Sequence, residues 1–255
     1  MVFILLPPSE GKTTPTSGGP VDLPALSYPE LTGARTRVIE ALTGASAGGP
    51  GAINAPPSTA AEVEANIHLL QAPTAPASEV YTGVLYAAAG LTDLPRTAAE
   101  RARAHVRIAS TVFGFLAPSD EIPAYRLPPA AKLPEIGAPI PFLSPEVSEV
   151  MDAQAPRLVL DCRSGPYVRL WRPTCPWVHV KAVEMRGGEP VVVSHFAKHH
   201  RGVLTRHLLT RNGELPATVD EVAQAARELL GIEYAEVTLA EGKPGTHVLE
   251  LTLLS

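Results

Sequence analysis

The chain has 255 residues, a hydrophobic fraction of 45% and a formal net charge of −5. A chain of this length and composition buries a substantial core, which excludes an intrinsically disordered protein. No apolar run reaches the roughly 20 residues that a membrane span needs, so the sequence predicts no membrane-spanning protein.

The first residues, MVFILLPPSEGK, lack the basic n-region and the long apolar stretch of a signal peptide. They predict a buried strand over residues 2–6, which ends at Pro7. The cysteines are Cys162 and Cys175, too few for a disulfide framework. We therefore expect a cytoplasmic protein with reduced thiols.

Residues 10–29 are rich in Gly, Pro, Ser and Thr and predict a long loop. Three helices with core-facing apolar spacing or capping signals follow in this half of the chain: residues 28–42, residues 58–70 with Ser58 as N-cap, and residues 97–108. Residues 78–89 predict another helix or a strand followed by a helix. The prolines of residues 127–145 predict irregular structure there.

The second half predicts strands at residues 156–160, 178–185 and 191–195, the last two joined by a hairpin turn at residues 186–188. Helices are expected at residues 196–209 and 219–229, the latter capped by Thr218. Residues 234–239 and 247–253 alternate and predict a closing hairpin. With neither a repeat nor a break in composition, we expect one α+β domain over residues 1–255, a mixed sheet surrounded by helices.

A basic segment stands out in this acidic chain. Residues 157–211 hold ten Lys or Arg against three Asp or Glu. On the predicted helix, Lys198 and Arg201 share one face, and Arg206 lies one turn beyond Gly202. Clustered cations create a local field that net charge hides, so the segment predicts a site for DNA or for a small phosphate or carboxylate ligand. A solvated surface helix is the alternative.

Gly202 is costly inside a helix, which indicates close approach by another backbone or a ligand.

The segment after the first strand, Ser9-Glu10-Gly11-Lys12-Thr13, invites comparison with a phosphate-binding P-loop. That motif needs a glycine where Leu6 stands and a helix where prolines follow, so a nucleotide triphosphatase is excluded. A strand end that presents Glu10 and Lys12 remains. Either the pair carries function, or it is an incidental ion pair in a solvated loop.

Other reactive residue types give weaker signals. His195 and His199 have helical metal-site spacing, but no third ligand is placed by the sequence, so we expect no metal and no cofactor. Cys162 fits a buried, inert thiol better than a nucleophile. Trp171 and Trp177 lie beside arginines and either stack on bases or, more commonly, pack in the core.

Five segments together resemble the YaaA peroxide-stress protein family. Their order and spacing carry the resemblance, which runs from Met1 to about Leu209. The segments are PSEGKT at residues 8–13, VYTG at 80–83, ASTVFGFLAP at 109–118 with YRL at 125–127, DCRSGPY at 161–167, and FAKHHRG at 196–202 with Arg206.

The resemblance implies a fold peculiar to the family, a positively charged cleft, a helix-hairpin-helix-like element and DNA binding linked to limiting oxidative damage. It also implies a polar cleft more specialised than a DNA surface, formed by Lys12, Tyr81, Arg126, Ser164, Tyr167, Lys198, Arg201 and Arg206. In the hairpin segment the family usually reads Ser-Gly-X-Tyr-Gly. Here Thr111 replaces the first glycine, which weakens the expectation that this turn grips phosphate.

Two functions follow from these residues. In the first, the protein binds DNA through Lys198, Arg201, Arg206 and the group around Arg163. In the second, it is an enzyme acting on a nucleotide, a nucleobase or another small anionic metabolite. Glu10 would then be the general acid or base, with Lys12 tuning its pKa. Arg126, Lys198 and Arg201 would bind the anion. Three further side chains would orient it, those of Tyr81, Ser164 and Tyr167.

An enclosed pocket favours the enzyme, and an open groove of duplex width favours the DNA-binding protein. A third possibility is a stress-linked protein whose polar residues satisfy one another in a buried network. The sequence specifies no oligomeric state.

Overall fold

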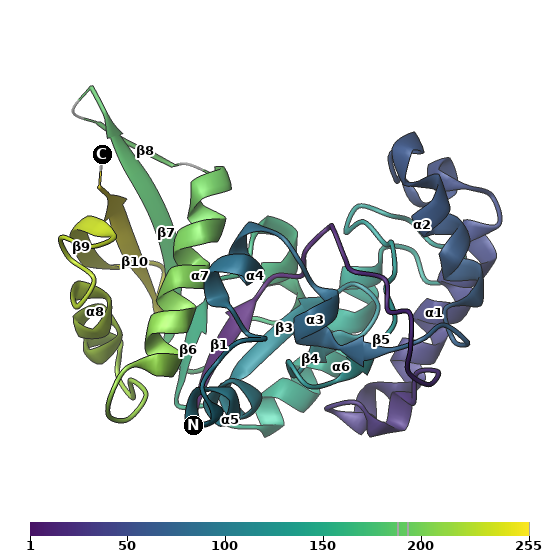
Figure 1. Ribbon diagram of the computed structural model, residues 1–255, viewed down its shortest axis with the longest axis horizontal. Helices are drawn as coiled ribbons and strands as arrows, with labels where there is room; N and C mark the ends of the chain where they lie inside the picture. The colour runs from purple at the N-terminus through teal and green to yellow at the C-terminus, as the bar shows by residue number, and fades with distance from the viewer. Residues whose placement is uncertain (188, 193, 255) are drawn as a thin grey trace.

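A computed structural model describes residues 1–187, 189–192 and 194–254 (Figure 1). Its centre is an eight-stranded mixed sheet in the order β4-β3-β1-β6-β7-β10-β9, with β8 paired to β7. The strands are β1 (Val2–Leu6), β3 (Val106–Ser110), β4 (Gly114–Leu116), β6 (Leu158–Asp161), β7 (Trp177–Arg186), β8 (Glu189–Val192), β9 (Tyr234–Glu241) and β10 (Thr246–Leu253).

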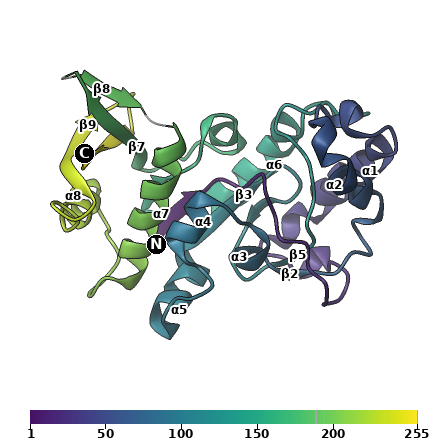
Figure 2. The same ribbon diagram turned by 45° about the horizontal axis from the view of Figure 1, so that its top comes forward.

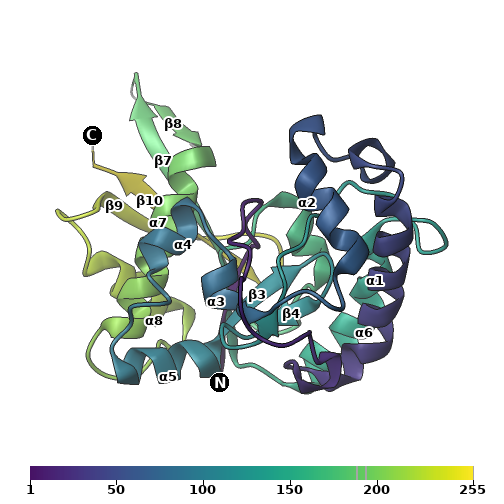
Figure 3. The same cartoon turned by 45° about the vertical axis from the view of Figure 1, so that its right-hand side comes forward.

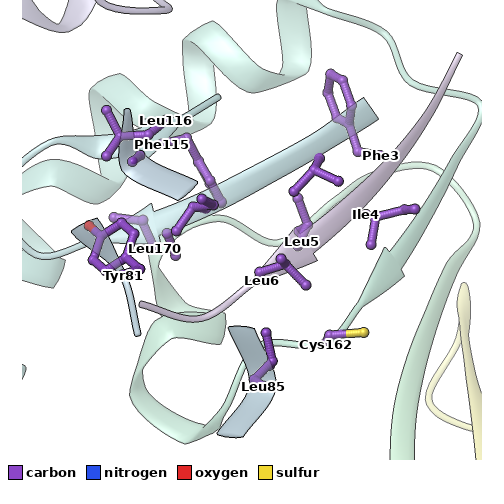
Figure 4. Packing of buried hydrophobic residues seen from close by; sticks show 14 of the residues in the cluster. Phe3, Ile4, Leu5, Leu6, Tyr81, Leu85, Phe115, Leu116, Cys162 and Leu170 are labelled. Carbon is purple, nitrogen blue, oxygen red and sulfur yellow. The ribbon is translucent and has the colours of Figure 1, made fainter. Parts of the chain in front are cut away.

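Strand β1 lies between β3 and β6 and is parallel to both, with Ile4 opposite Val106 and Leu160. All five of its residues are buried, as expected for a strand covered on both faces. Figure 4 shows Phe3, Ile4, Leu5 and Leu6 among the surrounding apolar side chains. The predicted first strand is confirmed.

The predicted mixed sheet with surrounding helices is confirmed, but the class is α/β. Five neighbouring strands, β3, β1, β6, β7 and β10, run parallel, while β4, β8 and β9 are antiparallel to their partners. Parallel neighbours need crossover connections, and helices supply most of them. The hairpin of β9 and β10 is confirmed, and β10 also pairs with β7, far from it in sequence.

Helices α1 (Thr32–Ser46) and α6 (Pro139–Ala153) pack together beside β4, and α4 (Val84–Ala89), α5 (Arg96–His105) and α7 (Ser194–Thr210) pack around β1 and β7. Figures 2 and 3 show the two groups from different sides, with α4 against α7 in both. The C-terminal helix α8 (Val219–Arg227) lies along β9, and the side chain of Thr218 caps it as predicted. The short α2 (Ala60–Ala65), α3 (Ala77–Val80), β2 (Ala75–Pro76) and β5 (Glu121–Ile122) complete this part of the chain.

Several predicted boundaries are wrong. The helix expected to reach residue 108 ends at His105, because residues 106–110 pair with β1 instead. Ser58 is not the N-cap: Thr59 holds that position, and α2 is only one and a half turns long. The proline-rich stretch is partly helical, since α6 begins at Pro139, where a missing N–H costs nothing.

The predicted strand at residues 191–195 is β8 as far as Val192. Residue 193 lies outside the described residues, and α7 already begins at Ser194.

The structure does not confirm a helix-hairpin-helix-like element at residues 109–118. This segment is the β-hairpin of β3 and β4, whose turn holds Val112 and Phe113 fully buried. Thr111 is also buried, and its hydroxyl donates to the Leu127 carbonyl at 2.9 Å. The turn is therefore largely part of the core.

Gly202 marks the closest approach between α4 and α7, as its helical position predicted. A Cβ placed there lies 2.3 Å from the carbonyl oxygen of Leu85 and 2.8 Å from Cβ of Ala88. Only glycine therefore lets the two helices come together.

We expect Gly202→Ala to lower the free energy of unfolding by about 1–3 kcal/mol, because α7 must move away from α4. Denaturant unfolding measures the change. Gly44→Ala is the matched control, since Gly44 lies inside α1 with no atom within 4 Å of its added Cβ. That variant should be neutral or up to about 1 kcal/mol more stable. Equal effects at the two positions would contradict the packing argument.

Candidate functional site

A cleft lies at the carboxyl ends of β1, β3 and β6. Two adjoining cavities of about 220 and 490 Å³ share Pro8, Ser9, Glu10, Pro129 and Tyr167. The carboxyl edge of parallel strands is where open α/β sheets bind ligands. The polar side chains along the two cavities belong to Ser9, Glu10, Lys12, Asn54, Thr82, Tyr86, Thr111, Tyr125, Arg126, Ser164, Tyr167 and Lys198.

The loop after β1 is fixed by hydrogen bonds to the end of α3 and to the segment between α3 and α4. The N–H of Thr13 donates to the Val80 carbonyl at 2.9 Å, and the N–H of Thr82 donates to the Ser9 hydroxyl at 3.0 Å. The ammonium of Lys12 donates to the Ser9 carbonyl at 3.1 Å and lies 4.2 Å from the centre of the Tyr125 ring. Lys12 is thus directed inward, into the smaller cavity.

Burial lowers the pKa of Lys12 to about 7, and the nearby charge of Arg126 adds to the effect. At neutral pH a substantial fraction of this side chain is therefore an uncharged amine. Such an amine can accept a proton or act as a nucleophile, roles that an ordinary lysine lacks.

Buried tyrosines form the floor beneath Lys12. The hydroxyls of Tyr81 and Tyr125 lie 2.8 Å apart, and the Tyr125 hydroxyl is 2.8 Å from that of Ser110. Burial raises the pKa of Tyr81 and Tyr125, so both stay neutral. Tyr81 has 1% of its surface exposed and does not line either cavity. It therefore supports Lys12 from below.

Arg126 is held in place through its backbone. The amide of the buried Asn66 accepts from the N–H of Arg126 at 2.9 Å and donates to its carbonyl at 2.8 Å. The guanidinium then lies between the carboxylates of Glu10, at 3.7 Å, and Glu62, at 3.5 Å. The sequence offered no signal for Asn66 or Glu62 beyond their place in a predicted helix.

The segment after β6 carries Ser164 and Tyr167 into the larger cavity. Arg163 anchors this segment from inside: it is fully buried, forms a bidentate pair with Asp161 at 2.8 and 2.9 Å, and donates to the carbonyls of Tyr167 and Trp171. A guanidinium with these partners and no exposed surface does not face the cleft. Arg163 therefore positions the cleft segment.

The three predicted cations of α7 point to different surroundings. Lys198 is exposed and lines the larger cavity. Arg201 instead donates twice to the Val180 carbonyl of β7, at 2.9 and 3.1 Å. Arg206 donates to the Gly90 carbonyl at 3.1 Å and pairs with Asp93 at 2.8 Å. Of the three, only Lys198 reaches the cleft.

Cys162, Trp171 and Trp177 take the roles that the sequence favoured, an inert thiol and packed indole rings. Burial raises the pKa of Cys162 to about 12, so its thiol stays protonated and inert. The indole N–H of Trp171 donates to Asp152 at 2.9 Å, and that of Trp177 donates to Asp161 at 3.0 Å.

No helix among the described residues has the length and apolar character to span a membrane.

Comparison with known proteins places the chain among bacterial relatives. The model of the family described as peroxide stress protein YaaA matches residues 2–233. A UPF0246 protein of Corynebacterium efficiens is 39% identical over 231 residues, which cover 89% of this chain and 92% of that protein. A UPF0246 protein of Streptomyces coelicolor is 35% identical over 250 residues, covering 95% of this chain and 96% of the relative.

The lowered pKa of Lys12 is directly measurable. In protein labelled with 13C-lysine, we expect the Cε resonance that disappears in Lys12→Met to titrate with a midpoint near about 7. The unfolded chain then binds more protons at Lys12 than the folded chain between that midpoint and the ordinary pKa of 10.5. The stability of wild type relative to Lys12→Met should therefore rise with pH across this window. A midpoint above about 9 would contradict the burial argument.

Proposed function

The chain belongs to the peroxide stress protein YaaA family, and we propose that its cleft binds a small phosphate- or carboxylate-bearing metabolite and acts on it in the cytoplasm. The observation that carries this proposal is the convergence of Lys12, Arg126 and Lys198, from three separate segments, on the two adjoining cavities. Anion sites in proteins are commonly built from cationic side chains that converge in this way.

The electrostatics of the cleft support an anionic ligand. Among the described residues, the ammonium of Lys12 has only backbone carbonyls as hydrogen-bond partners. The ion pairs of Arg126 with Glu10 and Glu62, at 3.7 and 3.5 Å, are long, so its charge is only loosely neutralised. Within the described part of the chain Lys198 forms no ion pair. A bound phosphate or carboxylate supplies the negative charge that these three groups lack.

The cleft also suggests which residue transfers protons. The carboxylate of Glu10 is 84% exposed and lies beside Arg126. Lys12 is the more enclosed group and has a pKa of about 7, close to the working pH of a general acid or base. We therefore assign the proton-transfer role to Lys12. Glu10 holds Arg126, and Ser164 and Tyr167, which line the larger cavity, orient the ligand.

DNA binding is a second candidate, favoured by exposed cations beside the cleft. Arg169 and Arg172 follow Tyr167 closely in sequence and are exposed, as is Lys198. Arg201 and Arg206 contribute less to such a surface, because backbone carbonyls already occupy their guanidinium groups. Binding of this kind would involve the phosphate backbone and would weaken steeply with salt.

Thermal shifts with inorganic phosphate and a panel of mononucleotides test the cleft. We expect at least one ligand to stabilise wild type, and Lys12→Met and Arg126→Gln each to weaken binding about 10–100-fold, the loss expected for one charge-assisted hydrogen bond. Lys243→Met is the control, since Lys243 is exposed in the turn between β9 and β10. A ligand shift that survives both cleft substitutions would place the binding elsewhere.

A short labelled duplex, titrated with salt, separates the two candidates. Duplex binding that falls steeply with salt and is lost in an Arg169→Ala, Arg172→Ala double variant would favour the DNA-binding function. No duplex binding, together with a mononucleotide shift, would favour the enzyme. If neither ligand binds, the proposal of an anion cleft is wrong.

A further inference from the structure

A cluster of metal-ligating side chains lies on α7 away from the cleft. The side chains of His199, His200 and Glu233 each offer a ligand atom, and these atoms all lie within 4.8 Å of one another. We propose that the three residues bind a divalent transition-metal ion, with Zn²⁺ as the best match. This inference does not depend on the function proposed for the cleft.

The fold brings the three residues together from two segments. His199 and His200 are consecutive in α7, and Glu233 lies in the turn between α8 and β9. The sequence pairs His199 with His195, whose side chain lies outside the described residues, and it places no third ligand. Tertiary structure supplies Glu233, which is 33 positions further along the chain than His200.

His200 provides independent evidence for a missing partner. Only 8% of its surface is exposed, yet its Nδ1 atom has no hydrogen-bond partner among the described atoms. The nearest carboxylate oxygen, Oε2 of Glu233, lies 3.7 Å away, too far for a hydrogen bond. A buried, unsatisfied ring nitrogen is costly, and a metal ion bound between it and the carboxylate would satisfy both.

The separation between His200 and Glu233 is close to that of two zinc ligands, and His199 completes a cluster whose ligand atoms lie within 4.8 Å of one another. Two ligands bound tetrahedrally at 2.0–2.1 Å lie about 3.3 Å apart, so the His200 and Glu233 atoms need to approach by only a few tenths of an ångström. His199 and Glu233 are only partly buried, which leaves them room to rotate and leaves an entry path for the ion. Two imidazoles and one carboxylate form a donor set that zinc accepts, with water in the fourth position.

The surroundings hold the ligands in place. The hydroxyl of Tyr234 donates to the His200 carbonyl at 3.3 Å, and its ring lies 5.6 Å from the His200 ring. The residue after Glu233 thus already contacts α7. A bound ion would fasten the turn before β9 to α7, next to Lys198, which lines the cleft.

The test uses untagged, full-length protein and Zn²⁺ in competition with a chromogenic chelator. We expect one equivalent of Zn²⁺ to bind and to raise Tm. His199→Ala and Glu233→Gln should each weaken binding at least tenfold and abolish the rise in Tm.

His207→Ala is the matched control. His207 also lies on α7 beside a carboxylate, that of Glu228 at 2.9 Å, but no third metal-ligating side chain joins this pair among the described residues. Its substitution should leave Zn²⁺ affinity unchanged. Absorption of the Co²⁺-loaded wild type needs no variant, and an intense visible d–d band would report a four-coordinate site.

Two results would overturn the proposal. One is the absence of stoichiometric Zn²⁺ binding to wild type. The other is wild-type affinity in both His199→Ala and Glu233→Gln, which would assign the ion to other histidines. Far-UV circular dichroism of the variants separates lost metal binding from lost folding.

Discussion

The parallel pairing of β1 with β3 and β6 is the constraint on which the rest of the structure depends. It places Leu6, Ser110 and Asp161, the last residues of three strands, at the same edge of the sheet. Ser9, Glu10 and Lys12 come from the loop that leaves β1 at this edge, and Ser164 and Tyr167 come from the segment that leaves β6 there. The apolar character of β1 buries this strand on both faces. The strand therefore helps to fix the position of Lys12, which lies in the loop that follows it.

Three of the ten cations in the basic segment bind backbone carbonyls of the fold. Arg163 is enclosed by Asp161 and two carbonyls, Arg201 binds a strand carbonyl, and Arg206 binds the carbonyl at the end of α4. Each of these guanidinium groups donates to main-chain carbonyls, which require hydrogen-bond partners wherever they are removed from water. These three arginines thus hold chain segments in place around β6, β7 and the end of α4.

Helix α7 connects the two sites that we propose. Lys198 faces the cleft, His199 and His200 face the turn before β9, and Gly202 lets the same helix lie against α4, which follows the cleft residue Thr82. A change in the position of α7 would move Lys198 relative to Lys12 and Arg126. The tight contact at Gly202 limits that movement, because the backbone of α4 leaves no space for a side chain.

The sequence by itself determined most strands, the helix of α7, the closing hairpin, the close approach at Gly202 and the inert character of Cys162. These features depend on local alternation, capping and residue size, which neighbouring residues encode. It also indicated Lys12, Arg126, Ser164, Tyr167 and Lys198 through a family resemblance.

Only the tertiary structure decided which charges face the cleft, which are enclosed, and that the sheet is largely parallel. The helix before residue 106 ends there because the next residues pair with β1. Helix α6 can begin at Pro139 because proline is tolerated in the first turn of a helix. Asn66 and Glu233 gave no signal of their contacts in the sequence, because their partners lie 60 and 33 residues away. The pKa of Lys12 and the missing hydrogen bond of His200 both depend on burial and on the polar groups nearby. Both are decided only when these distant segments come together.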